Sequence, residues 1–149
     1  MAEKSILVYG YGNPGRQDDG IGPLIAEKID ALNLQDVITG SDYQLNIEDA
    51  YDIARCKAVF FVDASVDGDE PYVLSEVFPA NEIRFTTHTL PPASLLSLCE
   101  ELYGITLPAY LLAVRGYSFE FNEPMTSKAE SNMKEAFNIL TEKLLTMLN

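Results

Sequence analysis

The sequence predicts a single α/β domain over residues 1–149, with three layers and a mostly parallel, twisted sheet of about five strands that carries helices on both faces. Short apolar runs typical of strands alternate along the chain with segments in which apolar residues recur at the helical period. The runs at 5–10 and 57–62 are almost continuously apolar, as in strands buried on both faces of a parallel sheet. This alternation is typical of helices packed on both sides of one sheet. No Gly/Ser-rich or Pro-rich linker divides the chain, so we expect no domain boundary.

The first half of the chain predicts three strands and two helices. A strand over 5–10 leads through a glycine-rich loop into a helix that tolerates Pro23 in its first turn. The apolar side of this helix carries Ile21, Leu24, Ile25, Ile29 and Leu32. Residues 36–43 predict a second strand, and Asn46 is expected to cap a short helix, with Asp49 three residues later. The apolar face predicted for that helix is Ile47, Ala50, Tyr51 and Ala54. The run at 57–62 predicts the central strand, which we expect to stop at Asp63.

The second half predicts two further strands and two longer helices. Residues 72–78 alternate between apolar and polar, as in a strand near an edge, and 109–116 is a buried strand. Between them, Thr89 is expected to cap a helix that accepts Pro91 and Pro92 in its first turn and ends at Gly104. Its predicted core face is Leu95, Leu98, Cys99 and Leu102. The capping box Ser127-x-x-Glu130 predicts the start of the last helix. That helix is expected to pack through Met133, Phe137, Leu140, Leu144 and Leu148.

Charge and composition exclude several classes of function. The chain has 23 acidic against 10 basic residues and a formal charge of −13, so its surface repels phosphate backbones and nucleic acid is not an expected partner. The apolar runs are too short to cross a bilayer, and MAEKS leads into a strand without a signal-peptide pattern. We therefore expect a soluble, cytoplasmic protein without a membrane partner. Cys56 and Cys99 lie among apolar neighbours at no metal or redox spacing, which favours small core residues.

The loop after the first strand matches the dinucleotide fingerprint at Gly10-x-Gly12-x-x-Gly15. A pyrophosphate would need free backbone N–H groups and neutral or positive residues there. Instead, Pro14 removes one N–H, and the Asp18-Asp19 pair places negative charge where the phosphate would lie. The glycines are better interpreted as turn residues that deliver a carboxylate to the end of a strand.

Three groups of polar side chains fall where strands end or a helix begins: the Asp18-Asp19 pair, Asp63 and His88. In open α/β sheets, sites form outside the carboxyl ends of the strands. Two carboxylates and an imidazole can hold a divalent transition metal with open positions, or serve as general acid and base. Each residue also has a structural alternative: Asp19 could complement a helix dipole, Asp63 could cap, and His88 could be a polar surface residue. We find no G-x-S-x-G elbow, Walker loop or H-E-x-x-H helix.

Three separated motifs resemble one family in the right order. GNPGRQDDGIG at 12–22, VDA at 62–64, and HTLPPASLL followed by LYG within 88–104 resemble the maturation endopeptidases of nickel-iron hydrogenases. The resemblance covers nearly the whole chain. It implies a hydrolase, an aspartyl-type endopeptidase that removes a short C-terminal extension from the hydrogenase large-subunit precursor once nickel has been inserted. The precursor is then the expected partner, and we expect the chain to act as a monomer.

The resemblance also implies which residues contact the metal. The positions of the family carry over to Asp19, Asp63 and His88, and the same three residues are the catalytic candidates. The first position is often a glutamate in relatives, and the shorter aspartate could alter reach or affinity. The nickel comes with the substrate in this reading, so the enzyme need hold no metal at rest. Which carboxylate acts as the base is left open.

Three alternatives from other classes remain at this point. GNPG after an apolar strand also resembles peptidyl-tRNA hydrolases, but those need a histidine soon after the motif and a basic surface, and this chain has Asp18 and Asp19 there. A dinucleotide-binding oxidoreductase would bind NAD or FAD. A non-catalytic nickel-binding assembly protein would bind the same precursor and leave its C-terminus uncut.

Overall fold

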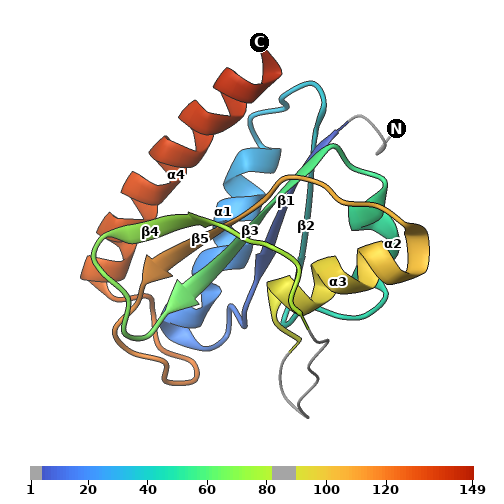
Figure 1. Ribbon diagram of the computed structural model, residues 1–149. Coiled ribbons are helices and arrows are strands. Elements are labelled where there is room, and N and C mark those ends of the chain that lie inside the picture. The colour runs from blue at the N-terminus through green and yellow to red at the C-terminus, as the bar shows by residue number, and fades with distance from the viewer. Residues whose placement is uncertain (1–4, 82–89) are drawn as a thin grey trace.

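One twisted sheet runs through the computed structural model, which describes residues 5–81 and 90–149 (Figure 1). Its five strands lie in the order β2-β1-β3-β5-β4. Their bounds are β1 Ile6–Tyr11, β2 Val37–Asp42, β3 Ala58–Ser65, β4 Tyr72–Glu76 and β5 Ala109–Arg115. The first four in this order are parallel, and β4 joins β5 antiparallel at one edge. The predicted fold class is confirmed, including the edge position of the strand within 72–78.

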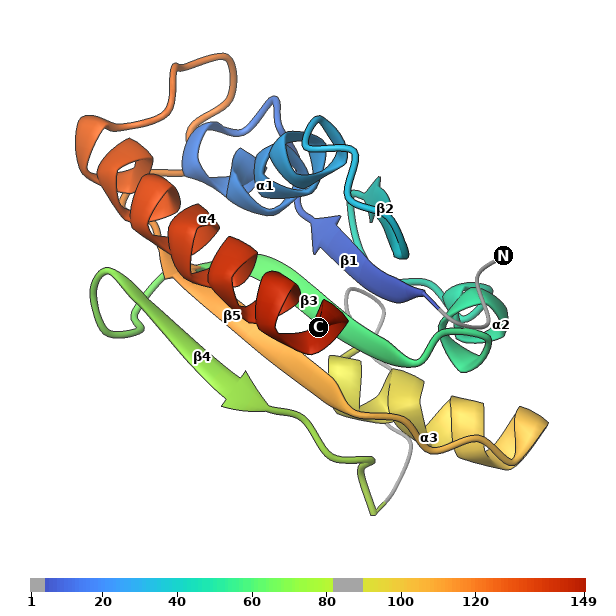
Figure 2. The same cartoon turned by 90° about the horizontal axis from the view of Figure 1, so that it is seen from above.

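Helices cover both faces of the sheet, as predicted (Figure 2). α1 (Ile21–Asp30) and α4 (Ser127–Leu148) lie on one face, and α2 (Asp49–Ala54) and α3 (Pro92–Tyr103) lie on the other. Because successive strand residues point to opposite faces, β1 contributes Ile6 and Val8 to the first core and Leu7 and Tyr9 to the second. Burial on both sides is the reason that the central strands read as unbroken apolar runs.

The helix ends agree with the sequence in part. Gly104 ends α3 in the left-handed conformation, as predicted. The cap of α4 is Thr126, one residue before the predicted Ser127, because the Thr126 hydroxyl accepts the N–H of Ala129 at 3.3 Å. Thr89, the predicted cap of α3, lies outside the described residues. At α2 the helix begins at Asp49, and the Asn46 N–H donates to its carboxylate at 2.8 Å.

Some predicted core positions were wrong. Ile47 and Tyr51 are exposed, and Ile53 fills the core beneath α2 instead. Leu102 is 56% exposed on the last turn of α3, and Leu32 is exposed because α1 ends before it. β3 does not stop at Asp63, since its pairing with β5 continues to Ser65.

The two cysteines are buried free thiols, as predicted. Within the described parts of the chain, no helix combines the length and apolar character needed to cross a membrane.

Candidate active site

Asp19 and Asp63 lie at the carboxyl ends of the neighbouring strands β1 and β3. Gly10 pairs with Val62, so Asp63 is the next residue along β3, while Asp19 lies in a short 3-10 helix, η2 (Gln17–Gly20), after the loop that follows β1. The two carboxylates are close enough for the charge of Asp19 to raise the pKa of Asp63. The structure therefore brings together two of the three predicted site residues.

Asp63 is held in a setting that favours its protonated form. Burial is the largest cause, and together with the negative charge of Asp19 it raises the pKa of Asp63 to about 7. Hydrogen bonds from the Ala64 N–H, at 2.8 Å, and from the Tyr11 hydroxyl lower the pKa of Asp63, but by less than burial raises it. A carboxyl group with a pKa near neutral can both take up and release a proton during a reaction at physiological pH.

Tyr11 is a site residue that the sequence analysis missed. Burial and the neighbouring Asp63 raise the pKa of its hydroxyl, so it stays protonated and acts as a hydrogen-bond donor to Asp63. The only signal for it in the sequence is its position as the last residue of β1, directly before Gly12.

Asp19 is fixed by the loop that carries it. Its Oδ2 accepts the N–H of Asn13 at 2.8 Å, and the Asn13 side chain in turn accepts the N–H of Gly15 at 2.9 Å. These bonds close the loop upon itself and set the direction of the carboxylate. The interpretation of the glycines as turn residues fits this geometry, since the backbone N–H of Asn13 is occupied by a carboxylate.

Gly12 is the glycine on which this loop depends most. Its φ is +140°, and a Cβ built there would lie 2.1 Å from the carbonyl oxygen of Asp19. Any side chain at this position must therefore push η2 away from β1, in addition to adopting an unfavourable backbone conformation.

Replacing Gly12 by alanine is expected to destabilise the protein by about 1–3 kcal/mol and to weaken the proposed activity, because Asp19 is displaced. Gly15→Ala is the matched control in the same loop, since its Cβ would meet only the side-chain oxygen of Asn13, at 3.3 Å. Urea unfolding of both variants measures the difference. Equal stabilities would show that the loop absorbs the added methyl group.

The structure divides the roles of the Asp18-Asp19 pair. Asp18 is 0% exposed and turns away from Asp19 towards the β5–α4 loop, residues 116–126. Its carboxylate accepts the N–H groups of Tyr117 at 2.8 Å, Ser118 at 3.1 Å and Thr126 at 2.8 Å, and also the Thr126 hydroxyl at 2.8 Å. Burial alone would raise the pKa of Asp18, but these four bonds outweigh it and lower the pKa. Asp18 therefore fastens one loop of the site to another.

His88, the third predicted residue, lies outside the described residues, so its position relative to the two carboxylates stays a prediction. Among the described residues, no group of three or more His, Cys, Asp or Glu side chains could hold a metal ion. The described part of the site is thus the pair Asp19 and Asp63, with Tyr11 beside it.

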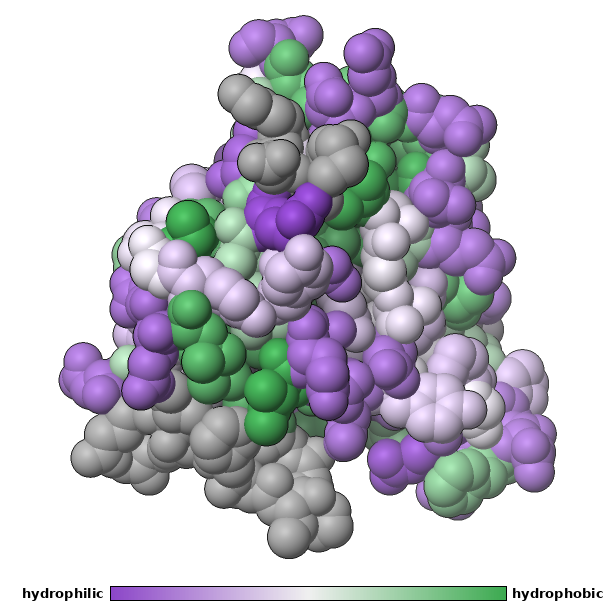
Figure 3. Space-filling view, turned by 90° about the vertical axis from the view of Figure 1, so that its right-hand side faces the viewer, coloured by the Kyte–Doolittle hydropathy of each residue, from purple (hydrophilic) through white to green (hydrophobic). Residues whose placement is uncertain are grey.

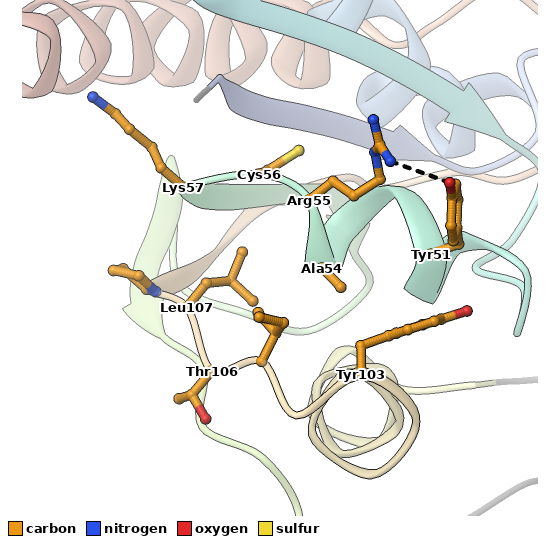
Figure 4. A pocket seen from close by; sticks show the side chains of 10 residues that line it. Tyr51, Ala54, Arg55, Cys56, Lys57, Tyr103, Thr106 and Leu107 are labelled. Atoms are coloured by element: carbon orange, nitrogen blue, oxygen red, sulfur yellow. Dashed lines mark hydrogen bonds between the residues drawn. The ribbon is translucent and has the colours of Figure 1, made fainter. Parts of the chain in front are cut away.

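A pocket of about 560 Å³ lies at the opposite end of the sheet (Figure 4). It opens beside the amino ends of β3 and β5, where Lys57 and Pro108 precede these strands. Arg55 in this pocket donates to the hydroxyl of Tyr51 at 3.1 Å. None of the described residues that line it carries a carboxylate, so among them there is neither a proton carrier nor an oxygen ligand of the kind found at the carboxyl ends.

The fold and the site define a class: an α/β protein with both faces of its sheet covered and an acidic site at the carboxyl ends of two adjacent parallel strands. Solved structures with a similar fold include hydrogenase maturation proteases. The chain is similar to the NiFe hydrogenase maturation protease HycI from Thermococcus kodakarensis, with a TM-score of 0.75 and 25% identity over 94% of this chain and 92% of that one. It is similar to the hydrogenase maturating endopeptidase HybD from E. coli, with a TM-score of 0.74 and 23% identity over 96% and 93%.

A third similar structure is the hydrogenase 2 maturation peptidase from a Thaumarchaeota archaeon, with a TM-score of 0.66 and 21% identity over 94% of this chain and 97% of the other. No protein-family model matches the chain, and neither does any curated protein sequence. The resemblance that the three motifs predict is confirmed by these structures, which agree with this chain over nearly its whole length.

Proposed function

We propose that this chain is an endopeptidase that removes the C-terminal extension of a nickel-iron hydrogenase large-subunit precursor after nickel insertion. The observation that carries the proposal is the agreement with solved hydrogenase maturation proteases over more than nine tenths of both chains. The pair Asp19 and Asp63 supports it, because these residues occupy the carboxyl edge at which the motifs predict the site.

The nickel ion is part of the substrate in this proposal. Oxygens of Asp19 and Asp63 and a ring nitrogen of His88 would contact the ion carried by the precursor, and so distinguish a loaded precursor from an empty one. Bound nickel supplies a Lewis acid beside the scissile peptide bond.

Asp63 is proposed as the proton carrier of the reaction. Water adds to the scissile carbonyl carbon and passes a proton to Asp63, and the C–N bond then breaks as that proton moves to the leaving amine. In the metal-free protein, burial and the charge of Asp19 raise the pKa of Asp63, which favours uptake of that proton. Tyr11 would act as a positioning residue, because its hydroxyl donates to Asp63 and holds the carboxyl group in place.

The main test uses purified chain with nickel-loaded and nickel-free precursor, followed by intact-mass measurement. We expect the loaded precursor to lose its C-terminal extension and the nickel-free precursor to keep its mass. If both keep their mass, the chain is a non-catalytic assembly protein. If both are cut, the enzyme does not recognise nickel.

We further propose that the protein acts as a monomer in the cytoplasm. The formal charge of −13 favours separation of like copies in solution. Light scattering during size-exclusion chromatography measures the mass in solution, and a mass of twice 16.5 kDa would overturn the monomer.

A further inference from the structure

Three strongly exposed apolar side chains lie at the same end of the sheet as the candidate active site. Tyr43, Val66 and Phe121 are 67%, 65% and 68% exposed. They lie in the segments that follow the parallel strands β2, β3 and β5, at the same end of the sheet as Asp19 and Asp63 (Figure 1). Phe78 is equally exposed at 68%, but it follows the antiparallel strand β4 and so lies towards the opposite end. We call Tyr43, Val66 and Phe121 the apolar rim.

The apolar rim lies along the loop that carries Asp19. The segment that follows β5 reaches this loop, because the Asn122 N–H donates to the carbonyl oxygen of Gly15 at 3.0 Å and the Arg16 guanidinium lies over the Phe121 ring. The Gly12 N–H donates to the carbonyl of Asp42 at 3.1 Å, which holds Tyr43 next to the loop that carries Asp19. Tyr43 and Phe121 therefore both lie beside the loop that carries Asp19.

Several contacts hold the loop that carries Phe121. The Arg16 side chain donates to the carbonyl of Phe119 at 3.0 Å, and its guanidinium lies 5.8 Å from the centre of the Phe121 ring. The Asn122 N–H donates to Gly15 at 3.0 Å, and Asp18 anchors both ends of the loop. An exposed aromatic ring that is already ordered loses little entropy on binding, which is a property of interface hot spots.

The loops that carry the apolar rim are strongly acidic. Segments 12–20, 42–48, 66–71 and 116–126 contain nine acidic residues and one basic residue, Arg16. This charge repels nucleic acid and attracts a protein surface with basic side chains. Figure 3 shows the side of the molecule that carries α2, where apolar groups lie among many polar ones.

We propose that the apolar rim and its acidic loops are the docking surface for the folded body of the precursor, whose contact surface would be apolar at its centre and basic around it. This inference rests on the proposed function and deepens it. The rim side chains protrude, with about two thirds of each surface exposed, so they fit recesses on a folded partner rather than enclose a single extended tail.

The test compares Phe121→Ala and Tyr43→Ala with Phe78→Ala in processing of the nickel-loaded precursor. We expect the two rim variants to raise KM by about tenfold with kcat unchanged, and Phe78→Ala to match the wild type. Thermal unfolding of each variant checks that the fold is retained. Equal KM values for Phe121→Ala and Phe78→Ala would overturn the inference.

Salt provides a second readout. KM should rise with ionic strength, and the rise should be smaller when Asp67, Asp69 and Glu123 are replaced together by their amides. A KM that does not change with salt would overturn the inference that the acidic loops attract basic side chains of the precursor. A dimer of the wild type that Phe121→Ala dissolves would assign the rim to self-association instead. If the wild type cuts no precursor, the proposed function itself fails, which is distinct from failure of the rim alone.

Discussion

Replacing Asp63 by asparagine is expected to lower kcat for removal of the C-terminal extension by a factor of about 10²–10⁴. Asparagine has the same shape and can still pair with the Ala64 N–H and the Tyr11 hydroxyl. It cannot exchange a proton, so the variant loses the chemistry and keeps the contacts. A single-turnover time course followed by intact mass measures the rate of the cleavage step without interference from product release.

The matched control is Asp52→Asn, an exposed aspartate on α2 away from the carboxyl ends of the strands. It should cleave at the wild-type rate. Wild-type rates in Asp63→Asn as well would remove Asp63 from the proton-transfer role and leave Asp19 as the remaining carboxylate.

The same assay tests His88, whose position lies outside the described residues. His88→Ala should abolish processing and leave the free energy of unfolding unchanged, because its proposed role is to contact the substrate's nickel. Normal cleavage by this variant would refute the proposal that Asp19, Asp63 and His88 together contact the nickel of the substrate.

Replacing Asp18 by alanine is expected to lower the free energy of unfolding by about 3 kcal/mol or more at pH 7. The N–H groups of Tyr117, Ser118 and Thr126 and the Thr126 hydroxyl would all lose their acceptor at a fully buried position. Each unsatisfied buried donor costs about 1–3 kcal/mol, reduced where water can enter. Urea unfolding measures the loss. Asp67→Ala, at an exposed position beyond β3, should change stability by less than about 0.5 kcal/mol.

The cost of losing Asp18 should also depend on pH. The folded protein lowers the pKa of Asp18, so the unfolded chain binds more protons in acid. The stabilisation is fully present above the unfolded pKa of about 3.9 and is lost as pH falls through the lower, folded pKa. The difference between wild type and Asp18→Ala should therefore shrink when unfolding is repeated at pH 4 and pH 3. A difference that stays constant with pH would mean that Asp18 acts through packing alone.

The strands and helices could be predicted because each signal for them is local. The unbroken apolar runs at 5–10 and 57–62 indicated burial on both faces, and the cores on the two sides of β1 and β3 confirm it. The errors in core positions and strand ends arose where contacts with segments distant in the sequence decide whether a residue is buried or paired. Leu102 fits the helical pattern of α3 but is 56% exposed on its last turn, and β3 continues past Asp63 because β5 pairs with it.

By itself, the sequence determined the fold class, the motifs, the acidic charge and the placement of Asp19 and Asp63 near the carboxyl edge of the sheet, because these follow from residue type and spacing. Only the tertiary structure shows why Asp19, and not the adjacent Asp18, faces the site. Asp18 is turned inwards by partners about a hundred residues away, at Tyr117 and Thr126, and Asp63 owes its raised pKa to burial, with a smaller contribution from the charge of Asp19. Such contacts depend on the packing of distant segments, which residue spacing along the chain does not encode.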